Sequence, residues 1–106
     1  MKTVLITGCS SGFGLRTALE FARRGGMVFA TMRSPGKAGR LLAEAETAGL
    51  TVNVLPLDVV DRDSVESAVA TIIERTGRLD VVVNNAGIFT VGPVEAHDDD
   101  ELLAAF

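Results

Sequence analysis

Short apolar runs alternate along the chain with stretches in which apolar residues recur at helical spacing. Four of the runs are apolar at consecutive positions, which is typical of strands that are buried on both faces of a sheet. The predicted strands are residues 3–7 (TVLIT), 27–32 (MVFATM), 51–55 (TVNVL) and 81–84 (VVVN). Strands that alternate with helices in this way predict an α/β fold with a parallel sheet.

The stretches between the strands carry apolar residues at i, i+3, i+4 and i+7, the spacing of an amphipathic helix. The clearest stripes are Leu15, Ala18, Leu19 and Ala22 after the first strand, and Val65, Ala68, Val69, Ile72 and Ile73 after the third. Capping signals predict the helix boundaries. Gly25 is expected to close the first helix. The second helix is expected to begin at Ser34-Pro35 and to end at Gly49. The third is expected to begin with the capping-box pattern from Asp63 to Glu66 and to end at Gly77. A loop with Gly92-Pro93 is expected to lead to a further helix at about Asp98.

Crossover handedness limits how these elements can be arranged. Crossovers between parallel strands are right-handed, so helices on both faces require the fourth strand to return beside the first. We therefore expect a Rossmann-type three-layer αβα fold with about four parallel strands in the order 3-2-1-4. Ligands bind such sheets at the switch point, outside the carboxyl ends of the strands.

The composition narrows the class of protein. The 106 residues are 47% hydrophobic with a formal net charge of −4, as expected for a single globular domain. No basic face is visible, which argues against a nucleic-acid binder. The apolar run at the N-terminus is too short for a membrane span, so no membrane partner is expected. The single cysteine, Cys9, fits the reducing cytoplasm and is interpreted as a small residue in a tight loop rather than a reactive thiol.

Three glycines follow the first predicted strand in the segment TGCSSGFG. Gly8 allows a sharp exit from the strand, Gly12 lets backbone amides approach an anion, and Gly14 permits close packing of helix on strand. The hydroxyls of Ser10 and Ser11 can add donors. Amides at the start of a helix favour a phosphate group, so the segment predicts a pyrophosphate cradle, with a purely structural glycine turn as the alternative.

The end of the second strand indicates which dinucleotide is preferred. An NAD site usually has an acidic residue there, but residues 27–43 contain none and instead carry Arg33, Lys37 and Arg40. Charge-assisted bonds from an arginine to a ribose 2′-phosphate favour NADP over NAD by about tenfold to hundredfold. Arg33 is the best-placed candidate, and Lys37 and Arg40 are interpreted as solvated helix residues.

Polar residues also follow the third and fourth strands. Asp58 could accept a hydrogen bond from an adenine amino group, or it could cap a turn or helix. Asn84 could brace the strand ends or contact the cofactor, and both interpretations stay open. For the segment from Asn85 to Gly87, contact with the cofactor is favoured.

The ordered motifs TGCSSGFG, LDV and NNAG resemble the short-chain dehydrogenase/reductase family, with the TGxxxGxG glycine spacing of its ordinary reductases. Details such as VFATMR and LDVVVNNAG are similar to hydroxysteroid dehydrogenases of the 17β type. The resemblance implies that Ser11 and Arg33 contact the 2′-phosphate of NADP and that Asp58 meets the adenine. The residues expected to bind the cofactor are Gly8, Ser10, Ser11, Gly12, Phe13, Gly14, Arg33, Asp58, Val59, Asn85, Ala86 and Gly87.

Enzymes of this family transfer a hydride between the nicotinamide and a carbonyl or alcohol substrate, and their catalytic tyrosine donates the proton. The chain has no tyrosine, and neither Lys2 nor Lys37 lies in a YxxxK context, so no catalytic residue is predicted. No spaced ligand set predicts a metal. His97 is interpreted as a loop residue, and the acids from Asp98 to Glu101 suit the start of a helix.

We therefore expect residues 1–106 to be the NADP-binding part of a longer reductase, truncated before the family's catalytic residues and short of its seven strands. The full-length protein is expected to be a cytoplasmic homo-oligomer that acts on a small-molecule carbonyl or alcohol. Two alternatives stay open. One is a stand-alone dinucleotide-binding module, and the other is an inactive fragment in which residues 81–83 form an exposed apolar sheet edge.

Overall fold

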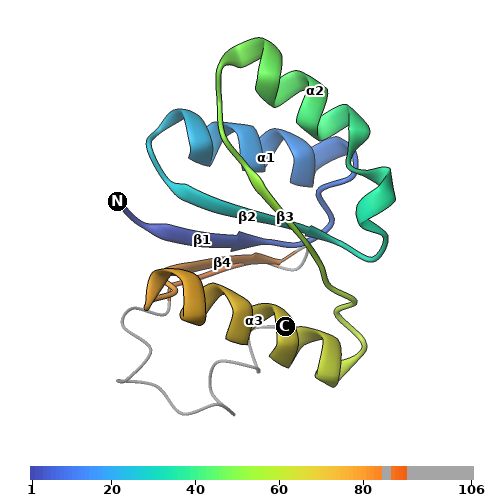
Figure 1. The fold of residues 1–106 in the computed structure, drawn as a ribbon, viewed down its shortest axis with the longest axis vertical. Coiled ribbons are helices and arrows are strands. Elements are labelled where there is room, and N and C mark those ends of the chain that lie inside the picture. The colour runs from blue at the N-terminus through green and yellow to red at the C-terminus, as the bar shows by residue number, and fades with distance from the viewer. Residues whose placement is uncertain (85–86, 91–106) are drawn as a thin grey trace.

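The computed structural model describes residues 1–84 and the backbone of residues 87–90 (Figure 1). Strands and helices alternate as predicted as far as β4. The elements are β1 (Thr3–Ile6), α1 (Gly12–Arg23), β2 (Met27–Met32), the 3₁₀ turn η1 (Pro35–Lys37), α2 (Gly39–Ala48), β3 (Asn53–Pro56), α3 (Arg62–Thr76), β4 (Val81–Asn84) and β5 (Gly87–Thr90).

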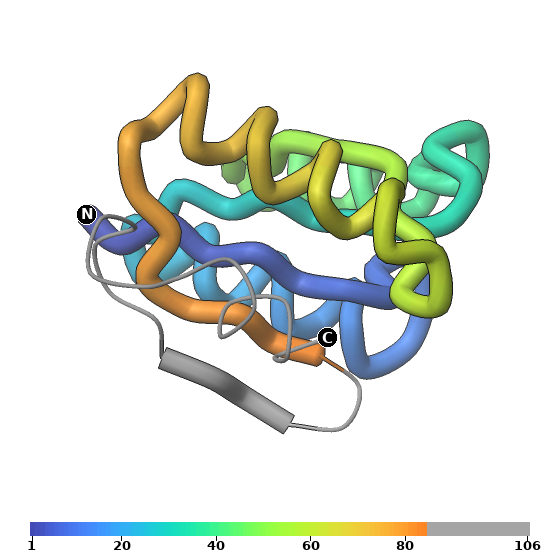
Figure 2. Tube along the Cα trace, turned by 90° about the horizontal axis from the view of Figure 1, so that it is seen from below, coloured from blue at the N-terminus to red at the C-terminus, as the bar shows by residue number. Residues whose placement is uncertain are grey.

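The sheet has the order β3-β2-β1-β4-β5, and its first four strands are parallel. The expected 3-2-1-4 order is therefore confirmed. β1 lies between β2 and β4, with Val4 opposite both Val28 and Val81 (Figure 2). The switch point between β1 and β4 follows from this order.

Strands β1, β2 and β4 bury side chains on both faces of the sheet. Helices α1 and α2 cover one face and α3 covers the other, which confirms the three layers (Figure 1). Along β1, Val4 and Ile6 pack with the α1 and α2 side, whereas Leu5 packs with α3. All three residues are fully buried, which explains why β1 is apolar at each position from Val4 to Ile6 and does not alternate.

The edge next to β4 differs from the expectation. β5 pairs antiparallel with β4, placing Val82 opposite Phe89 and Asn84 opposite Gly87. The prediction that residues 81–83 would form an exposed edge is therefore wrong, because β5 takes that position. The run GIFT has only three strand-forming residues, too few to give a strand signal against its glycine-containing surroundings. Gly92-Pro93, His97 and the helix expected at Asp98 lie outside the described residues.

Glycines close the helices as predicted. Gly25 follows α1 with φ of +87°, and its amide donates to the carbonyl of Ala22 while the amide of Gly26 donates to that of Phe21. This is the hydrogen-bond pattern of a Schellman motif. Gly49 and Gly77 end α2 and α3 with φ of +69° and +76°.

The predicted start of α3 is wrong by two residues. The side chain of Asp61 accepts from the amides of Asp63 and Ser64 at 3.0 and 3.3 Å, so Asp61 caps the helix. The hydroxyl of Ser64 is instead occupied by the amide of Asp58, which donates to it at 2.8 Å. An aspartate two residues upstream thus takes the capping role that the pattern from Asp63 suggested.

The predicted start of α2 is also wrong. Ser34-Pro35 opens only the single turn η1, the Ser34 side chain makes no capping bond, and α2 begins at Gly39. The glycines at 36 and 39 explain the interruption, because glycine costs about 1 kcal/mol relative to alanine within a helix. The third strand is Asn53–Pro56 rather than residues 51–55, and Pro56 is accommodated because β3 is an edge strand.

Asp80, which the sequence reading did not single out, ties the start of β4 to the start of β1. Its carboxylate accepts from the amide of Thr3 at 2.7 Å, and its own amide donates to the carbonyl of Thr3 at 2.9 Å. The Arg78 guanidinium donates to the same carboxylate through Nε and Nη2 at 2.9 and 2.6 Å. This bidentate pair lowers the pKa of Asp80 below its usual value, although burial acts in the opposite direction.

We predict that Asp80→Asn lowers the free energy of unfolding by about 1–3 kcal/mol at pH 7, since it removes charge-assisted bonds to a buried acceptor. Because folding depresses the pKa of this carboxyl, its contribution is present above about pH 4 and is lost as the pH falls through the folded-state value. Urea unfolding at several pH values should show the gap between wild type and Asp80→Asn closing below pH 4. A gap that stays constant down to pH 2 would contradict this assignment.

Candidate functional site

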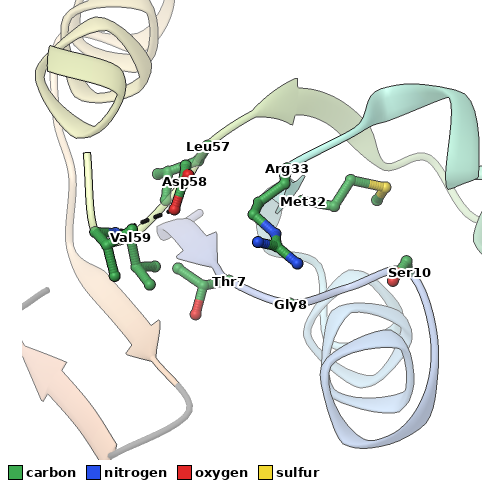
Figure 3. A pocket seen from close by; sticks show the side chains of 9 residues that line it. Thr7, Gly8, Ser10, Met32, Arg33, Leu57, Asp58 and Val59 are labelled. Atoms are coloured by element: carbon green, nitrogen blue, oxygen red, sulfur yellow. Dashed lines mark hydrogen bonds between the residues drawn. The ribbon is translucent and has the colours of Figure 1, made fainter. Parts of the chain in front are cut away.

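The carboxyl ends of β1, β2 and β3 open onto one pocket of about 350 Å³ (Figure 3). Its lining residues follow the ends of these three strands. They are Thr7, Gly8, Ser10, Met32, Arg33, Leu57, Asp58, Val59 and Val60. The pocket lies at the carboxyl edge of the sheet, and its described lining comes from the ends of β1, β2 and β3 and not from β4.

The loop between β1 and α1 forms one wall of this pocket. Gly8 and Gly12 have φ of +67° and +61°, in the left-handed region that favours glycine. A β-carbon on Gly14 would overlap the carbonyl oxygen of Gly8. Gly14 therefore allows the first turn of α1 to lie directly against the end of β1.

The first turn of α1 has amide groups available to an anion. Ser11 is the N-cap residue, but its side chain makes no capping bond, and the turn contains no acidic residue. The space where a Gly12 β-carbon would project is open, with no heavy atom within 4 Å. The first-turn amides and the positive end of the helix dipole suit a phosphate group, and there is open space beside Gly12.

Arg33 brings a positive charge to the pocket directly after β2. Figure 3 shows its side chain extending toward the loop at Gly8. Among the described residues it has no hydrogen bond or ion pair. Arg40, by contrast, pairs with Glu44 on the surface of α2 at 3.5 Å, and Lys37 is exposed on η1. Arg33 thus differs from Lys37 and Arg40, the two cations that were interpreted as solvated, because it alone of the three lines the pocket.

Asp58 forms the wall opposite Arg33 and is held in a turn. Its Oδ1 accepts from the amide of Val60 at 3.2 Å, the dashed line in Figure 3. Its backbone carbonyl accepts from the amide of Asp61 at 3.0 Å. Asp58 therefore makes the turn that was one of its two interpretations, and it also borders the pocket.

Asn84 and Thr7 connect the two sides of the switch point. The Thr7 hydroxyl donates to Oδ1 of Asn84 at 3.2 Å, and the Thr7 amide donates to the carbonyl of Val83 at 2.9 Å. This bond is the bracing of the strand ends that was one interpretation of Asn84, and contact with a cofactor stays a prediction. The end of β1 is thereby held against β4.

The predicted cofactor residues fall into three groups. Gly8, Ser10, Arg33, Asp58 and Val59 line the pocket. Ser11, Gly12, Phe13 and Gly14 lie at the start of α1 beside it, and Phe13 is 72% exposed. Asn85 and Ala86 lie outside the described residues, and Gly87 is described only as the backbone opposite Asn84 in β5.

Four lining residues were not predicted as site residues. They are Thr7, Met32, Leu57 and Val60. Each lies within four residues of a strand's carboxyl end, so counting outward from the strand ends could have found them. Thr7 and Leu57 lie within the motifs TGCSSGFG and LDV, but their side chains did not suggest a contact with the cofactor.

Cys9 lies in the loop between β1 and α1 and is fully buried. Its thiol donates to the carbonyl of Ile6 at 3.3 Å. Burial raises the pKa of this thiol to about 11, and a backbone hydrogen bond opposes the shift only in part. A thiol with such a pKa is protonated at neutral pH and is a poor nucleophile. This agrees with the interpretation of Cys9 as a small loop residue.

Comparisons with known proteins identify the family. The sequence pattern of the family described as short chain dehydrogenase matches residues 2–106. The chain belongs to the short-chain dehydrogenase family. It is 47% identical over 98 residues to retinol dehydrogenase 8 of Bos taurus, covering 89% of this chain and 31% of that protein. Over 101 residues it is 45% identical to estradiol 17-beta-dehydrogenase 1 of Rattus norvegicus, covering 90% of this chain and 29% of that one.

A solved short-chain dehydrogenase fold agrees with this assignment. The structure of an actinorhodin polyketide ketoreductase with NADPH has a TM-score of 0.72 and 36% sequence identity to this chain. It covers 95% of this chain, which in turn spans 38% of the ketoreductase. The chain thus spans about a third of the length of the relatives that it matches. In the described part of the structure, no helix is long and apolar enough to cross a membrane.

We predict that Gly14→Ala destabilises the chain by about 1–3 kcal/mol or more, because its β-carbon would push into the Gly8 carbonyl. Gly39→Ala is the matched control, since a β-carbon at that position meets nothing within 4 Å. The control should be neutral or stabilising by up to about 1 kcal/mol. Urea unfolding measures both, and equal stabilities of the two variants would refute the close approach.

We also predict that the stability of the wild type falls relative to Cys9→Ala as the pH rises from about 9 to about 11. Folding raises the pKa of the thiol, so its contribution is complete below the unfolded-state value and is lost as the pH approaches the folded-state value. The expected relative loss is about 3 kcal/mol at most. Parallel urea titrations of the two proteins at pH 7, 9 and 11 provide the measurement. Curves that keep a constant separation would show that the thiol ionises as readily folded as unfolded.

Proposed function

We propose that this chain binds NADP(H) at the carboxyl edge of its sheet, as the cofactor-binding part of a reductase that transfers hydride between nicotinamide and a carbonyl or alcohol substrate. The observation that carries the proposal is Arg33, a cation without an ionic partner among the described residues, placed at the pocket directly after β2. Membership of a family of dehydrogenases supports the reaction class.

The glycine loop is the proposed pyrophosphate site. The free first-turn amides of α1, the open space beside Gly12 and the absence of an acid in that turn all suit a doubly charged phosphate pair. A side chain at Gly12 would project into that space. The Ser10 hydroxyl lines the same pocket and adds a donor.

Arg33 is the proposed site of the ribose 2′-phosphate. NAD sites usually place a carboxylate at this strand end, where it accepts from the ribose hydroxyls. Here the position directly after β2 carries a guanidinium, and the only acid that lines the described pocket is Asp58, after β3. An arginine favours the 2′-phosphate because its planar donors match phosphate oxygens. For Asp58 we propose contact with the adenine amino group, with Val59 beside it.

The chemistry of hydride transfer is supplied by the bound nicotinamide, and this chain's residues hold the cofactor in place for it. The 106 residues contain no tyrosine, whereas general acid catalysis needs a positioned proton donor. We therefore propose that these residues are part of a longer reductase, whose proton donor lies elsewhere. Asn85, Ala86 and Gly87 are proposed to line the nucleoside.

The remaining proposals concern the whole protein. Its substrate is proposed to be a small carbonyl or alcohol, in keeping with relatives named for retinol and estradiol. A cytoplasmic location is supported by the single buried cysteine, which needs no oxidising compartment. A homo-oligomeric state is proposed from the family resemblance alone.

The test compares NADPH and NADH binding by Arg33→Ala with binding by wild type, using calorimetry or fluorescence. We predict that the Kd for NADPH rises by about tenfold to hundredfold and that the Kd for NADH changes little. Arg24→Ala is the matched control, because it removes the same charge from an exposed arginine at the far end of α1. It should leave both constants unchanged.

Three results would count against the proposal. If the NADPH to NADH preference is the same in wild type and Arg33→Ala, the arginine has no role in selecting the 2′-phosphate. If the wild type binds neither dinucleotide at millimolar concentration, the pocket is not a dinucleotide site in this chain. If these residues alone turn over a ketone, they contain a proton donor, which contradicts the proposal that the donor lies elsewhere.

A further inference from the structure

Thr31 is a polar residue in an otherwise apolar part of β2. It is fully buried, and its neighbours Phe29, Ala30 and Met32 belong to the hydrophobic clusters on the two faces of the sheet. A valine would fill a similar volume without a hydroxyl that needs a hydrogen-bond partner. The hydroxyl therefore calls for an explanation beyond packing.

The hydroxyl and the carbonyl of Thr31 both bind the segment that carries the glycine loop. Oγ1 of Thr31 donates to the carbonyl of Ile6 at 2.8 Å. The carbonyl of Thr31 accepts from the amide of Cys9 at 3.0 Å. These two bonds enclose Thr7 and Gly8, which line the pocket and include the left-handed turn at Gly8. One buried residue of β2 thus holds both ends of the turn.

The other side of the same turn is held by β4, since the amide of Thr7 donates to the carbonyl of Val83. Within the loop itself, the carbonyl of Ile6 also accepts from the thiol of Cys9 at 3.3 Å. A thiol is a weak donor, so the Thr31 hydroxyl is the stronger of these two side-chain bonds. Without it, the stem of the loop would keep its contact with β4 but lose its main side-chain anchor on β2.

We propose that Thr31 is a positioning residue for dinucleotide binding, which fixes the glycine loop through Ile6 and Cys9 and does not itself line the pocket. The identity of the ligand in this inference rests on the proposed function. The claim that Thr31 fixes the loop does not depend on the ligand. A loop with a fixed conformation presents its amides to a phosphate without the entropy loss of ordering them on binding.

The experiment uses three variants of the chain. Thr31→Val keeps the branched shape and removes the hydroxyl, Thr31→Ser keeps the hydroxyl and removes the methyl group, and Ile72→Val is a stability control in the α3 cluster. Ile72→Val costs about 0.5–1.5 kcal/mol in such a core and is remote from the loop. Two quantities are measured in each: the Kd for NADPH, and the ratio of amide hydrogen-exchange rates at Cys9 and Leu5. Exchange at Leu5 reports the stability of β1, so the ratio reports changes in the loop that are separate from changes in the stability of the strand.

We predict that Thr31→Val raises both the Kd and the exchange ratio by about twofold to tenfold, the range expected for one net hydrogen bond. Thr31→Ser should return both values to within about twofold of wild type, although it loses stability with its methyl group. Ile72→Val should leave both unchanged. If Thr31 only contributed to stability, Thr31→Ser and Ile72→Val would raise the Kd and the exchange ratio in the same way as Thr31→Val.

The positioning role is overturned if Thr31→Val leaves the exchange ratio unchanged, if it changes the ratio but not the Kd, or if Thr31→Ser is as impaired as Thr31→Val. Failure of the proposed function appears differently, as absence of NADPH binding by the wild type. In that case the exchange ratio alone decides whether Thr31 holds the loop.

Discussion

Burial of β1 on both faces and along both edges is the constraint on which the rest of the structure depends. Val4, Leu5 and Ile6 have no exposed surface, and β1 pairs with β2 on one side and β4 on the other. Parallel neighbours require crossover helices, and these helices supply the apolar stripes that cover the two faces. The same geometry brings three strand ends to one edge, so the pocket there is a consequence of how the core is built.

Around that edge the backbone is fixed by hydrogen bonds to buried groups. Thr7 is held to β4 through Val83 and Asn84, and the amide of Leu57 donates to the carbonyl of Met32 at 2.9 Å. Gly14 adds a steric constraint, because only a residue without a β-carbon lets α1 approach the end of β1 so closely. Binding amides that are held in this way need little reorganisation when a charged ligand arrives.

The pocket has charged residues of both signs in its lining, Arg33 and Asp58. Arg33 follows the end of β2, and its guanidinium has no partner among the described residues, whereas one carboxylate oxygen of Asp58, after β3, accepts from the Val60 amide. Arg40 and other arginines on the helices engage neighbouring carboxylates in exposed i,i+4 pairs, which contribute little to stability. A cation left without such a partner is therefore available for an anionic group of the ligand.

Periodicity and turn chemistry in the sequence alone determined the alternation of elements, the 3-2-1-4 order and the place of the glycine loop, because local spacing and crossover handedness decide these features. They placed Arg33 at the right strand end for the same reason. Only the tertiary structure decided which of several possible partners certain groups take. The hairpin of β4 and β5, the cap at Asp61 in place of Asp63, the anchoring of β1 by Asp80 and the grip of Thr31 on the loop are such features. In each of these features, packing selects the partner, which is either distant along the chain or one of several nearby candidates. No local pattern of residues specifies that choice.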